Sequence, residues 1–284
     1  MDLPGLVTTE WLAERIGSPD LRILDGSWYL PTSGRDARSE YVAGHLPGAV
    51  FFDLDALSDR DTPLPHMLPS PEAFARQVGD LGVGDEHEVV VYDGSGVNLS
   101  APRVWWMFRV FGHERVAVLD GGLQKWRREG RTLERGVVAP KRAHFTPRGL
   151  RAEAVRDLEA VRAAGEQRRE QIVDMRSAGR FAGREPEPRA GLRGGHIPGS
   201  HNLPYGELVA PDGTLLPPEA LRQRLAAAGV DPSRPVIATC GSGVSACALI
   251  HALHVLGYDT ASLYDGAWSE WGARSDTPVE RGGA

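Results

Sequence analysis

The sequence predicts an α/β protein of two similar domains, each a mostly parallel β-sheet flanked by helices. Two observations support this prediction. Short β-branched runs such as VVVY (89–92) and VIAT (236–239) alternate with helical patterns, which is typical of parallel sheets covered by helices. Four blocks of the first half also recur in the second half in the same order, and a repeat of this length indicates a duplicated domain.

The repeated blocks follow one order of elements in each half. They pair RILDGSW (22–28) with QIVDMRS (171–177), GHLPGAVFFDL (44–54) with GHIPGSHNLPY (195–205), residues 89–113 with 235–259, and VAVLDGGLQKW (116–126) with ASLYDGAWSEW (261–271). Each half thus begins with an apolar strand that ends in aspartate, and a GHxPG turn follows. The matched order is the reason to expect the same topology twice.

Between these blocks each half carries an amphipathic helix. PEAFARQVGDLG (71–82) and PEALRQRLAAAG (218–229) both begin with proline and end with glycine, the usual residues at the two ends of a helix. Residues 133–149 are rich in proline and basic side chains and lack periodicity, so we interpret them as a linker. The predicted domains are residues 1–146 and residues 147–284.

The bulk composition excludes several classes of protein. The chain has 284 residues, is 41% apolar and 25% charged, and carries a net charge of −6. This charge offers no basic surface for nucleic acid and no attraction to an acidic membrane. We find no signal-peptide pattern and no apolar stretch of about 18 residues. We therefore expect a cytoplasmic protein without a membrane or nucleic-acid partner.

The two cysteines are too few for a disulfide framework or a four-thiolate zinc site, and we expect neither metal nor cofactor. Cys240 directly follows a predicted strand, at the sheet edge where α/β proteins bind ligands. Cys247 falls two turns into the helix expected after it and is assigned to the core.

The segment after Cys240 has the composition of an anion cradle. It consists of Gly241, Ser242, Gly243, Val244 and Ser245. Glycines let successive backbone N–H groups turn inward, and a helix N-terminus behind them stabilises an anion such as a thiolate. The alternative is a strand-end cysteine that only packs as a small hydrophobe. In the first half the aligned loop, DGSGVN (93–98), has Asp93 in place of Cys240, which favours one active and one silent copy.

At this point the chain resembles the two-domain rhodanese-type sulfurtransferases. The resemblance rests on GRDARSEYVAGHLPGAVFFD (34–53), APRVWWMFRVFGH (101–113), GREPEPRAGLRGGHIPG (183–199) and CGSGVSA (240–246). It implies two tandem rhodanese-like domains, with the nucleophilic cysteine in the second domain and a silent first domain.

The loop is similar to one branch of this family. The thiosulfate branch has basic residues after the cysteine, whereas the 3-mercaptopyruvate branch has Cys-Gly-Ser/Thr-Gly-Val-Thr. Gly241 and Ser242 match the second branch, and Ser245 replaces its threonine while keeping the hydroxyl. The resemblance therefore implies 3-mercaptopyruvate as the sulfur donor.

The same resemblance assigns roles outside the loop. Arg180 and Arg189 match arginines that bind the donor's carboxylate and keto oxygens, for which a planar guanidinium is well suited. Arg184 and Arg193 are expected to be solvated loop charges.

His45, Asp36 and Ser242 resemble a serine–histidine–aspartate relay that would manage protons. The alternative for His45 is structural, because His196 occupies the matching place and both histidines can anchor the GHxPG turn.

The expected reaction is a two-step transfer in which Cys240 takes sulfur from 3-mercaptopyruvate, releases pyruvate and passes the sulfur to cyanide, a thiol or a thioredoxin-like protein. Three alternatives stay open at this point. The donor could be thiosulfate, or the chain could be a persulfide carrier serving one protein partner. The third alternative is a cysteine phosphatase. Such an enzyme needs an arginine six residues after its cysteine, and this chain has Ala246 at that position.

Overall fold

The computed structural model describes residues 3–167 and 169–283. The chain forms two compact units. Unit 1 consists of Met1–Arg60, Leu68–Arg151 and Val209–Leu215, and unit 2 consists of Asp61–Met67, Ala152–Leu208 and Leu216–Ala284. The main division falls between Arg151 and Ala152, close to the linker. Each unit also contains a short segment from the other half of the chain, which nothing in the sequence indicates.

Each unit contains a parallel sheet, which agrees with the predicted mostly parallel sheet, and the structure shows five strands in each. The strands of unit 1 are β1 (Leu6–Val7), β2 (Leu21–Asp25), β3 (Val50–Phe51), β4 (Glu88–Tyr92) and β5 (Val116–Leu119), in the order β1-β5-β4-β2-β3. The strands of unit 2 are β6 (Val155–Arg156), β7 (Gln171–Asp174), β8 (His201–Asn202), β9 (Val236–Thr239) and β10 (Ala261–Tyr264), in the order β6-β10-β9-β7-β8. The two orders correspond strand by strand, which confirms the duplicated α/β fold.

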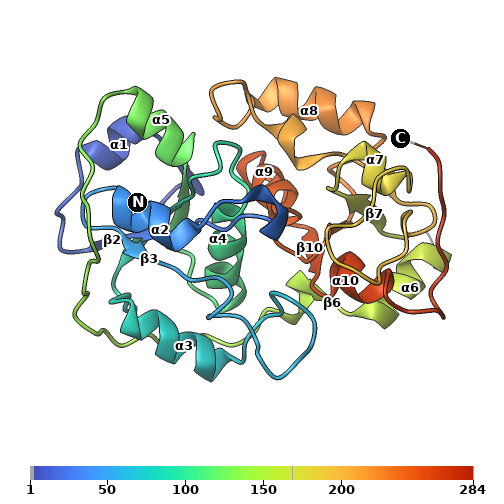
Figure 1. The fold of residues 1–284 in the computed structure, drawn as a ribbon, viewed down its shortest axis with the longest axis horizontal. Coiled ribbons are helices and arrows are strands. Elements are labelled where there is room, and N and C mark those ends of the chain that lie inside the picture. The colour runs from blue at the N-terminus through green and yellow to red at the C-terminus, as the bar shows by residue number, and fades with distance from the viewer. Residues whose placement is uncertain (1–2, 168, 284) are drawn as a thin grey trace. The chain divides into compact units, whose positions relative to one another are not determined.

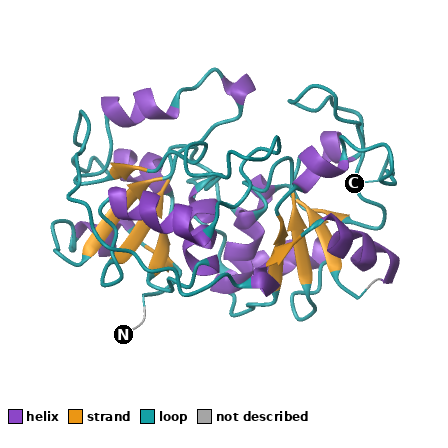
Figure 2. Ribbon diagram, turned by 90° about the horizontal axis from the view of Figure 1, so that it is seen from below, coloured by secondary structure: helices purple, strands orange, loops and turns teal. Residues whose placement is uncertain are grey.

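Helices pack around each sheet (Figures 1 and 2). Unit 1 contains α1 (Thr9–Ala13), α2 (Ala37–Ala43), α3 (Pro71–Asp80), α4 (Ala101–Val110), α5 (Gly122–Arg128) and the 3-10 turn η1 (Pro31–Ser33). Unit 2 contains α6 (Leu158–Gln167), α7 (Ala178–Phe181), α8 (Pro218–Ala227), α9 (Cys247–Val255), α10 (Ala267–Trp271) and the turns η2 (Ala152–Ala154) and η3 (Tyr205–Leu208). None of the helices in the described ranges is long and apolar enough to cross a membrane.

The two helices predicted from proline and glycine form as expected. α3 and α8 begin at Pro71 and Pro218, and each ends two residues before the predicted glycine. Gly82 and Gly229 have φ angles of 79° and 72°, a left-handed conformation that favours glycine and stops the helix. The predicted linker, residues 133–149, packs against the rest of unit 1, because Phe145 is buried with its ring centroid 5.7 Å from that of Phe74.

The sheet of unit 2 positions the candidate site. The register of the neighbouring parallel strands β7 and β9 pairs Asp174 with Thr239. Parallel strands end at the same edge of a sheet, so Met175, which precedes Arg176, and Cys240 leave the sheet side by side. The strands are buried on both faces, which explains their continuous apolar sequences.

Candidate functional site

Cys240 is buried at the carboxyl end of β9. The first residues of α10 donate hydrogen bonds to the carbonyl groups of Cys240 and Gly241. The N–H of Trp268 donates to the Cys240 carbonyl at 3.0 Å, and the N–H of Ser269 donates to the Gly241 carbonyl at 2.9 Å. In a trans peptide the C=O and the next N–H point in opposite directions. The N–H groups of Gly241 and Ser242 therefore point away from α10.

Most backbone N–H groups of the loop have no acceptor among the residues that the structure describes. Within the described ranges, no group accepts a hydrogen bond from the N–H of Gly241, Ser242, Val244, Ser245 or Ala246. Gly243 has a φ of 76°, which lets the backbone curl at this point. Such a set of amides before a helix is suited to an anion.

Helix α9 begins later than the sequence suggests. Cys247 is the first residue of α9 rather than two turns inside it, because residues 241–246, which include Gly243, form bends and turns instead of helix. Its assignment to the core is confirmed, since the residue has no exposed surface and its Sγ lies 3.4 Å from the Gly243 carbonyl oxygen.

The matching loop of unit 1 has the same shape and contains its own anion. Gly96 has a φ of 81°, like its counterpart in unit 2. Oδ1 of Asp93 accepts the N–H of Ser95 at 2.8 Å, while Oδ2 accepts those of Ser100 and Ala101 at 2.9 Å each. A carboxylate thus satisfies backbone donors at the start of α4, whereas in the corresponding loop of unit 2 the N–H groups of Gly241, Ser242, Val244 and Ser245 have no acceptor among the described residues.

Ser242 has a partner that the sequence pattern does not indicate. Its Oγ lies 3.0 Å from Nδ1 of His66, and both side chains are buried. His66 belongs to the segment Asp61–Met67 of unit 2 and falls outside the four repeated blocks. Its φ of 62° is unusual for a residue other than glycine. Backbone strain of this kind is often held in place at functional sites.

His45 has the contacts of a turn anchor in unit 1. Its Nδ1 lies 2.8 Å from the Tyr41 carbonyl oxygen, and its ring stacks on Tyr41 at 4.2 Å. His196 repeats this arrangement in unit 2, with 2.8 Å to the Phe181 carbonyl oxygen and a ring separation of 3.7 Å. This correspondence favours the structural alternative for His45.

Asp36 has a local role at the start of α2. Its carboxylate accepts the N–H of Ser39 at 2.6 Å, and hydrogen bonds from Ser39 keep the pKa of Asp36 below its usual range. Asp36 and His45 are described in full, and no hydrogen bond joins them. The structure therefore does not assemble these two residues into a relay.

Arg180 lies against the cysteine loop. Its Nη2 and Nε donate to Oε2 of Glu187 at 2.5 Å and 3.2 Å. A Cβ atom at Gly241 would come within 2.9 Å of the same Nη2. The absence of a side chain at Gly241 thus leaves room for the guanidinium beside Cys240.

Arg176 is a buried cation that the sequence did not single out, although it lies in the repeated block 171–177. Its guanidinium donates to both oxygens of Asp174, to Oε1 of Glu187 and to the Gly195 carbonyl. Burial alone would lower the pKa of Arg176, but the two carboxylates raise it above its usual value. The guanidinium also stacks over Trp268 at 4.3 Å, the residue that holds the Cys240 carbonyl.

The other arginines of this segment differ in exposure. Arg189 is half-buried and Arg184 is exposed, as expected for a solvated loop charge. The same expectation is wrong for Arg193, whose guanidinium donates to the carbonyl groups of Gly272, Thr277 and Trp271. Because Arg193 joins the end of α10 to the chain that follows, its role is structural.

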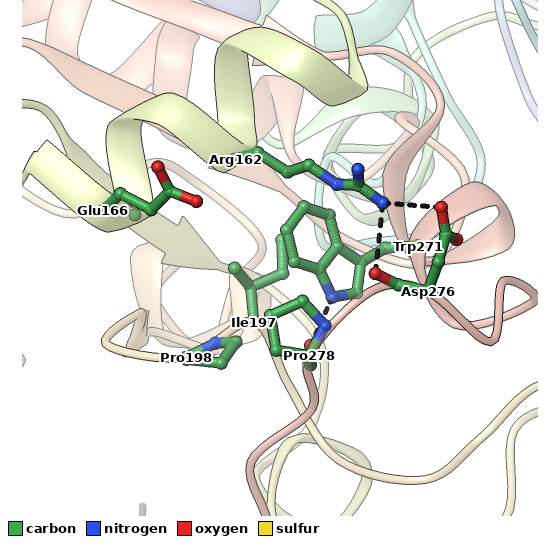
Figure 3. A pocket seen from close by; sticks show the side chains of 8 residues that line it. Arg162, Glu166, Ile197, Pro198, Trp271, Asp276 and Pro278 are labelled. Atoms are coloured by element: carbon green, nitrogen blue, oxygen red, sulfur yellow. Dashed lines mark hydrogen bonds and ion pairs between the residues drawn. The ribbon is translucent and has the colours of Figure 1, made fainter.

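Unit 2 also contains a pocket of about 330 Å³ that is separate from the cysteine loop (Figure 3). Its lining includes Arg162, Glu166, Ile197, Pro198, Trp271, Asp276 and Pro278. A pocket of unit 1 includes Pro47 and Trp126, which correspond to Pro198 and Trp271. Because both units have this pocket, we attribute it to the shared fold rather than to the chemistry of Cys240.

Comparison with known proteins extends the similarity over both units. A model described as the rhodanese-like domain matches residues 8–129 and again residues 157–274. The 3-mercaptopyruvate sulfurtransferase of Homo sapiens is 46% identical over 276 residues, which cover 95% of this chain and 93% of that protein. The thiosulfate sulfurtransferase of Bos taurus is 44% identical over 286 residues, with coverage of 98% and 96%. The crystal structure of SseA from Escherichia coli, titled as a 3-mercaptopyruvate sulfotransferase, has a TM-score of 0.85 and 43% identity over 94% of this chain and 100% of that one.

Proposed function

Because this chain belongs to the rhodanese-like domain family, we propose that it is a sulfurtransferase with Cys240 as its nucleophile. The proposed donor is 3-mercaptopyruvate, the products are pyruvate and a Cys240 persulfide, and the acceptor is a thiol or cyanide. The observation that carries the proposal is the contrast between the two loops. Asp93 supplies an anion in unit 1, whereas the N–H groups of Gly241, Ser242, Val244 and Ser245 have no acceptor within the described ranges.

In the first step the Cys240 thiolate attacks the sulfur of the donor. An S–S bond forms, the donor's C–S bond breaks, and its electron pair leaves with the carbon as the enolate of pyruvate. The enolate then takes up a proton, and the persulfide anion is stabilised by the loop amides. In the second step the acceptor attacks the outer sulfur, and Cys240 leaves as a thiolate.

The proton in the first step requires a donor near the loop. We assign this task to the pair of His66 and Ser242, whose polar atoms are 3.0 Å apart. This assignment replaces the relay of His45 and Asp36, both of which have structural contacts of their own. Arg180 and Arg189 are proposed to bind the donor's carboxylate and keto oxygens.

Unit 1 is proposed to lack transfer chemistry of its own. Asp93 occupies the position of the nucleophile there, and its carboxylate is already engaged by three backbone N–H groups. A carboxylate cannot carry a sulfane sulfur as a thiolate does.

Thiosulfate is the second candidate donor, since a thiosulfate sulfurtransferase is 44% identical to this chain. The chain is about equally identical to a 3-mercaptopyruvate sulfurtransferase and to a thiosulfate sulfurtransferase, so the choice of donor rests on the cysteine loop. The residues after Cys240, Gly241 and Ser242, carry no positive charge. Thiosulfate, a dianion, would depend more on such a charge for its binding energy than 3-mercaptopyruvate, a monocarboxylate. A carrier that delivers sulfur to one protein is the remaining alternative.

Mass spectrometry and steady-state kinetics test the proposal. Incubation with 3-mercaptopyruvate should add one sulfur atom to Cys240, and Cys247→Ser should react like the wild type. The wild type should use 3-mercaptopyruvate more efficiently than thiosulfate, with cyanide or reduced thioredoxin as the acceptor. Full activity of a Cys240→Ser variant would refute the proposed nucleophile, and rapid transfer to one protein only would favour the carrier.

We also propose a cytoplasmic location. Its support is that neither Cys240 nor Cys247 forms a disulfide within the described ranges, and cysteines stay reduced in a reducing compartment. Fractionation of the source cells with an antibody tests this location directly.

A further inference from the structure

Glu187 connects two arginines beside the cysteine loop. Its side chain is only 2% exposed. Oε1 accepts Nη1 of Arg176 at 2.7 Å, and Oε2 accepts Nη2 of Arg180 at 2.5 Å and Nε at 3.2 Å. One carboxylate thus binds both a fully buried guanidinium and a second one that borders Gly241, the residue after Cys240. Because both guanidinium groups bind the same carboxylate, the orientation of Arg180 depends on where Arg176 holds Glu187.

Arg176 provides the fixed end of this connection. Its side chain has no exposed surface, and Nε, Nη1 and Nη2 all donate to groups at the end of β7, on Glu187 and at Gly195. It therefore has no edge left for a substrate. A cation that is buried and bonded at every nitrogen holds Glu187 in one orientation.

Arg180 is the arginine of this pair that can bind an anion. Its side chain is 16% exposed, and Nη1 donates to no group within the described ranges. Oε2 of Glu187 occupies the edge of the guanidinium formed by Nε and Nη2, and Nη2 also borders the vacant side-chain position of Gly241. The opposite end, with Nη1, is left for an anion that approaches Cys240. A guanidinium without this support would sample several rotamers and lose part of its binding energy to ordering.

The charges of the cluster also favour this arrangement. Asp174, Arg176, Glu187 and Arg180 alternate in sign and sum to zero. The two buried ion pairs compensate one another, so Glu187 can hold Arg180 without leaving an uncompensated negative charge to repel an anionic donor.

We propose that Glu187 is a positioning residue that, fixed by Arg176, aims Arg180 at anionic reagents bound beside Cys240. This role rests on the proposed function only in naming the donor's carboxylate as the physiological anion. The positioning itself can be measured without sulfur transfer.

Alkylation of Cys240 by iodoacetate and by neutral iodoacetamide measures this positioning. The two reagents deliver nearly the same group, so the ratio of their rates reports how well the site attracts an anion. We expect Glu187→Gln to lower this ratio about tenfold and to raise the KM for 3-mercaptopyruvate by a similar factor, with kcat within about twofold. Glu185→Gln is the matched control, because it removes the same charge from an exposed position of the same loop and should leave the ratio unchanged.

A double-mutant cycle separates positioning from general structural damage. If Glu187 acts through Arg180, the variant with both Glu187→Gln and Arg180→Lys should have the same ratio as Arg180→Lys alone. Should Glu187→Gln fail to fold, Glu187→Asp decides the matter, since it keeps the charge but is too short to reach both arginines. Its ratio should also fall.

Two results would overturn the proposal: a ratio in both Glu187 variants equal to that of Glu185→Gln, or additive losses in the double variant. A wild type that prefers iodoacetate but transfers no sulfur would instead refute the proposed function and leave the positioning role intact.

Discussion

Nδ1 of His66 lies 3.0 Å from Oγ of Ser242, although the two residues are 176 positions apart in the chain. The segment Asp61–Met67, which contains His66, belongs to the compact unit that contains the cysteine loop. The contact gives the loop hydroxyl an imidazole partner, a group that can pass a proton to or take one from a hydroxyl. His66 also has a left-handed backbone with a φ of 62°, a conformation that persists only where surrounding contacts hold it.

Replacing His66 should slow the first transfer step. Asparagine tolerates the same left-handed backbone, so His66→Asn removes the imidazole ring without straining the chain. We expect kcat for pyruvate release to fall about a hundredfold, the usual contribution of a positioned acid or base. The measurement is a stopped-flow or coupled assay of pyruvate at saturating 3-mercaptopyruvate.

Ser242→Ala supplies the control for this prediction. If the two residues act as one unit, the double variant should be no slower than the slower single variant. A rate within twofold of wild type for His66→Asn, with an unchanged melting temperature, would contradict the role.

His45→Gln should reduce stability rather than activity. The change removes a buried hydrogen bond to the Tyr41 carbonyl and a ring stack at 4.2 Å, a loss of about 1–2 kcal/mol in unfolding free energy. The kcat/KM of the folded variant should stay within twofold of wild type. His196→Gln is the matched variant in unit 2, and urea unfolding with activity assays compares the two. A hundredfold loss of activity in His45→Gln at normal stability would restore the relay.

Asp93→Ala should destabilise unit 1. The substitution leaves the N–H groups of Ser95, Ser100 and Ala101 without their acceptor, which costs about 2 kcal/mol. Asp93→Asn keeps one acceptor oxygen and should lose less. Differential scanning calorimetry measures both, and the sulfur content of Cys240 after donor treatment should be unchanged. Equal stability of Asp93→Ala and wild type would show that the carboxylate does not support the loop.

Asp25 should make stability depend on pH. Burial at the end of β2, opposed in part by hydrogen bonds from Ser27, raises the pKa of Asp25 to about 6. The folded state then keeps a proton that the unfolded chain loses near pH 4, so the stability due to this group falls as the pH rises from about 4 to 6.

Asp25→Asn should remove this loss. The unfolding free energy of the variant relative to wild type should rise by on the order of 3 kcal/mol between pH 4 and 6 and stay level above that. Denaturant titrations across this range measure the difference, in which the titration of all other groups cancels. A difference that does not vary with pH would mean that Asp25 ionises alike in the folded and unfolded chains.

The sequence by itself determined the duplicated α/β fold, the parallel strands and the loop after Cys240. These features depend on local signals: β-branched runs, proline and glycine at helix ends, and Gly243 where the backbone needs a positive φ. The substitution of Asp93 for Cys240 was also visible in the aligned repeats, because both loops kept the same frame.

Tertiary structure decided which side chains meet. His66 and Ser242 lie in different halves of the chain, and Glu187 reaches Arg176 and Arg180 across turns that have no periodic pattern. In the sequence, the histidines of the two GHxPG turns are compatible with either a relay or an anchor, and only their contacts with backbone carbonyl groups in the fold favour the anchor. Secondary structure follows from neighbours in sequence, whereas a catalytic constellation depends on packing between segments, which local propensity does not encode.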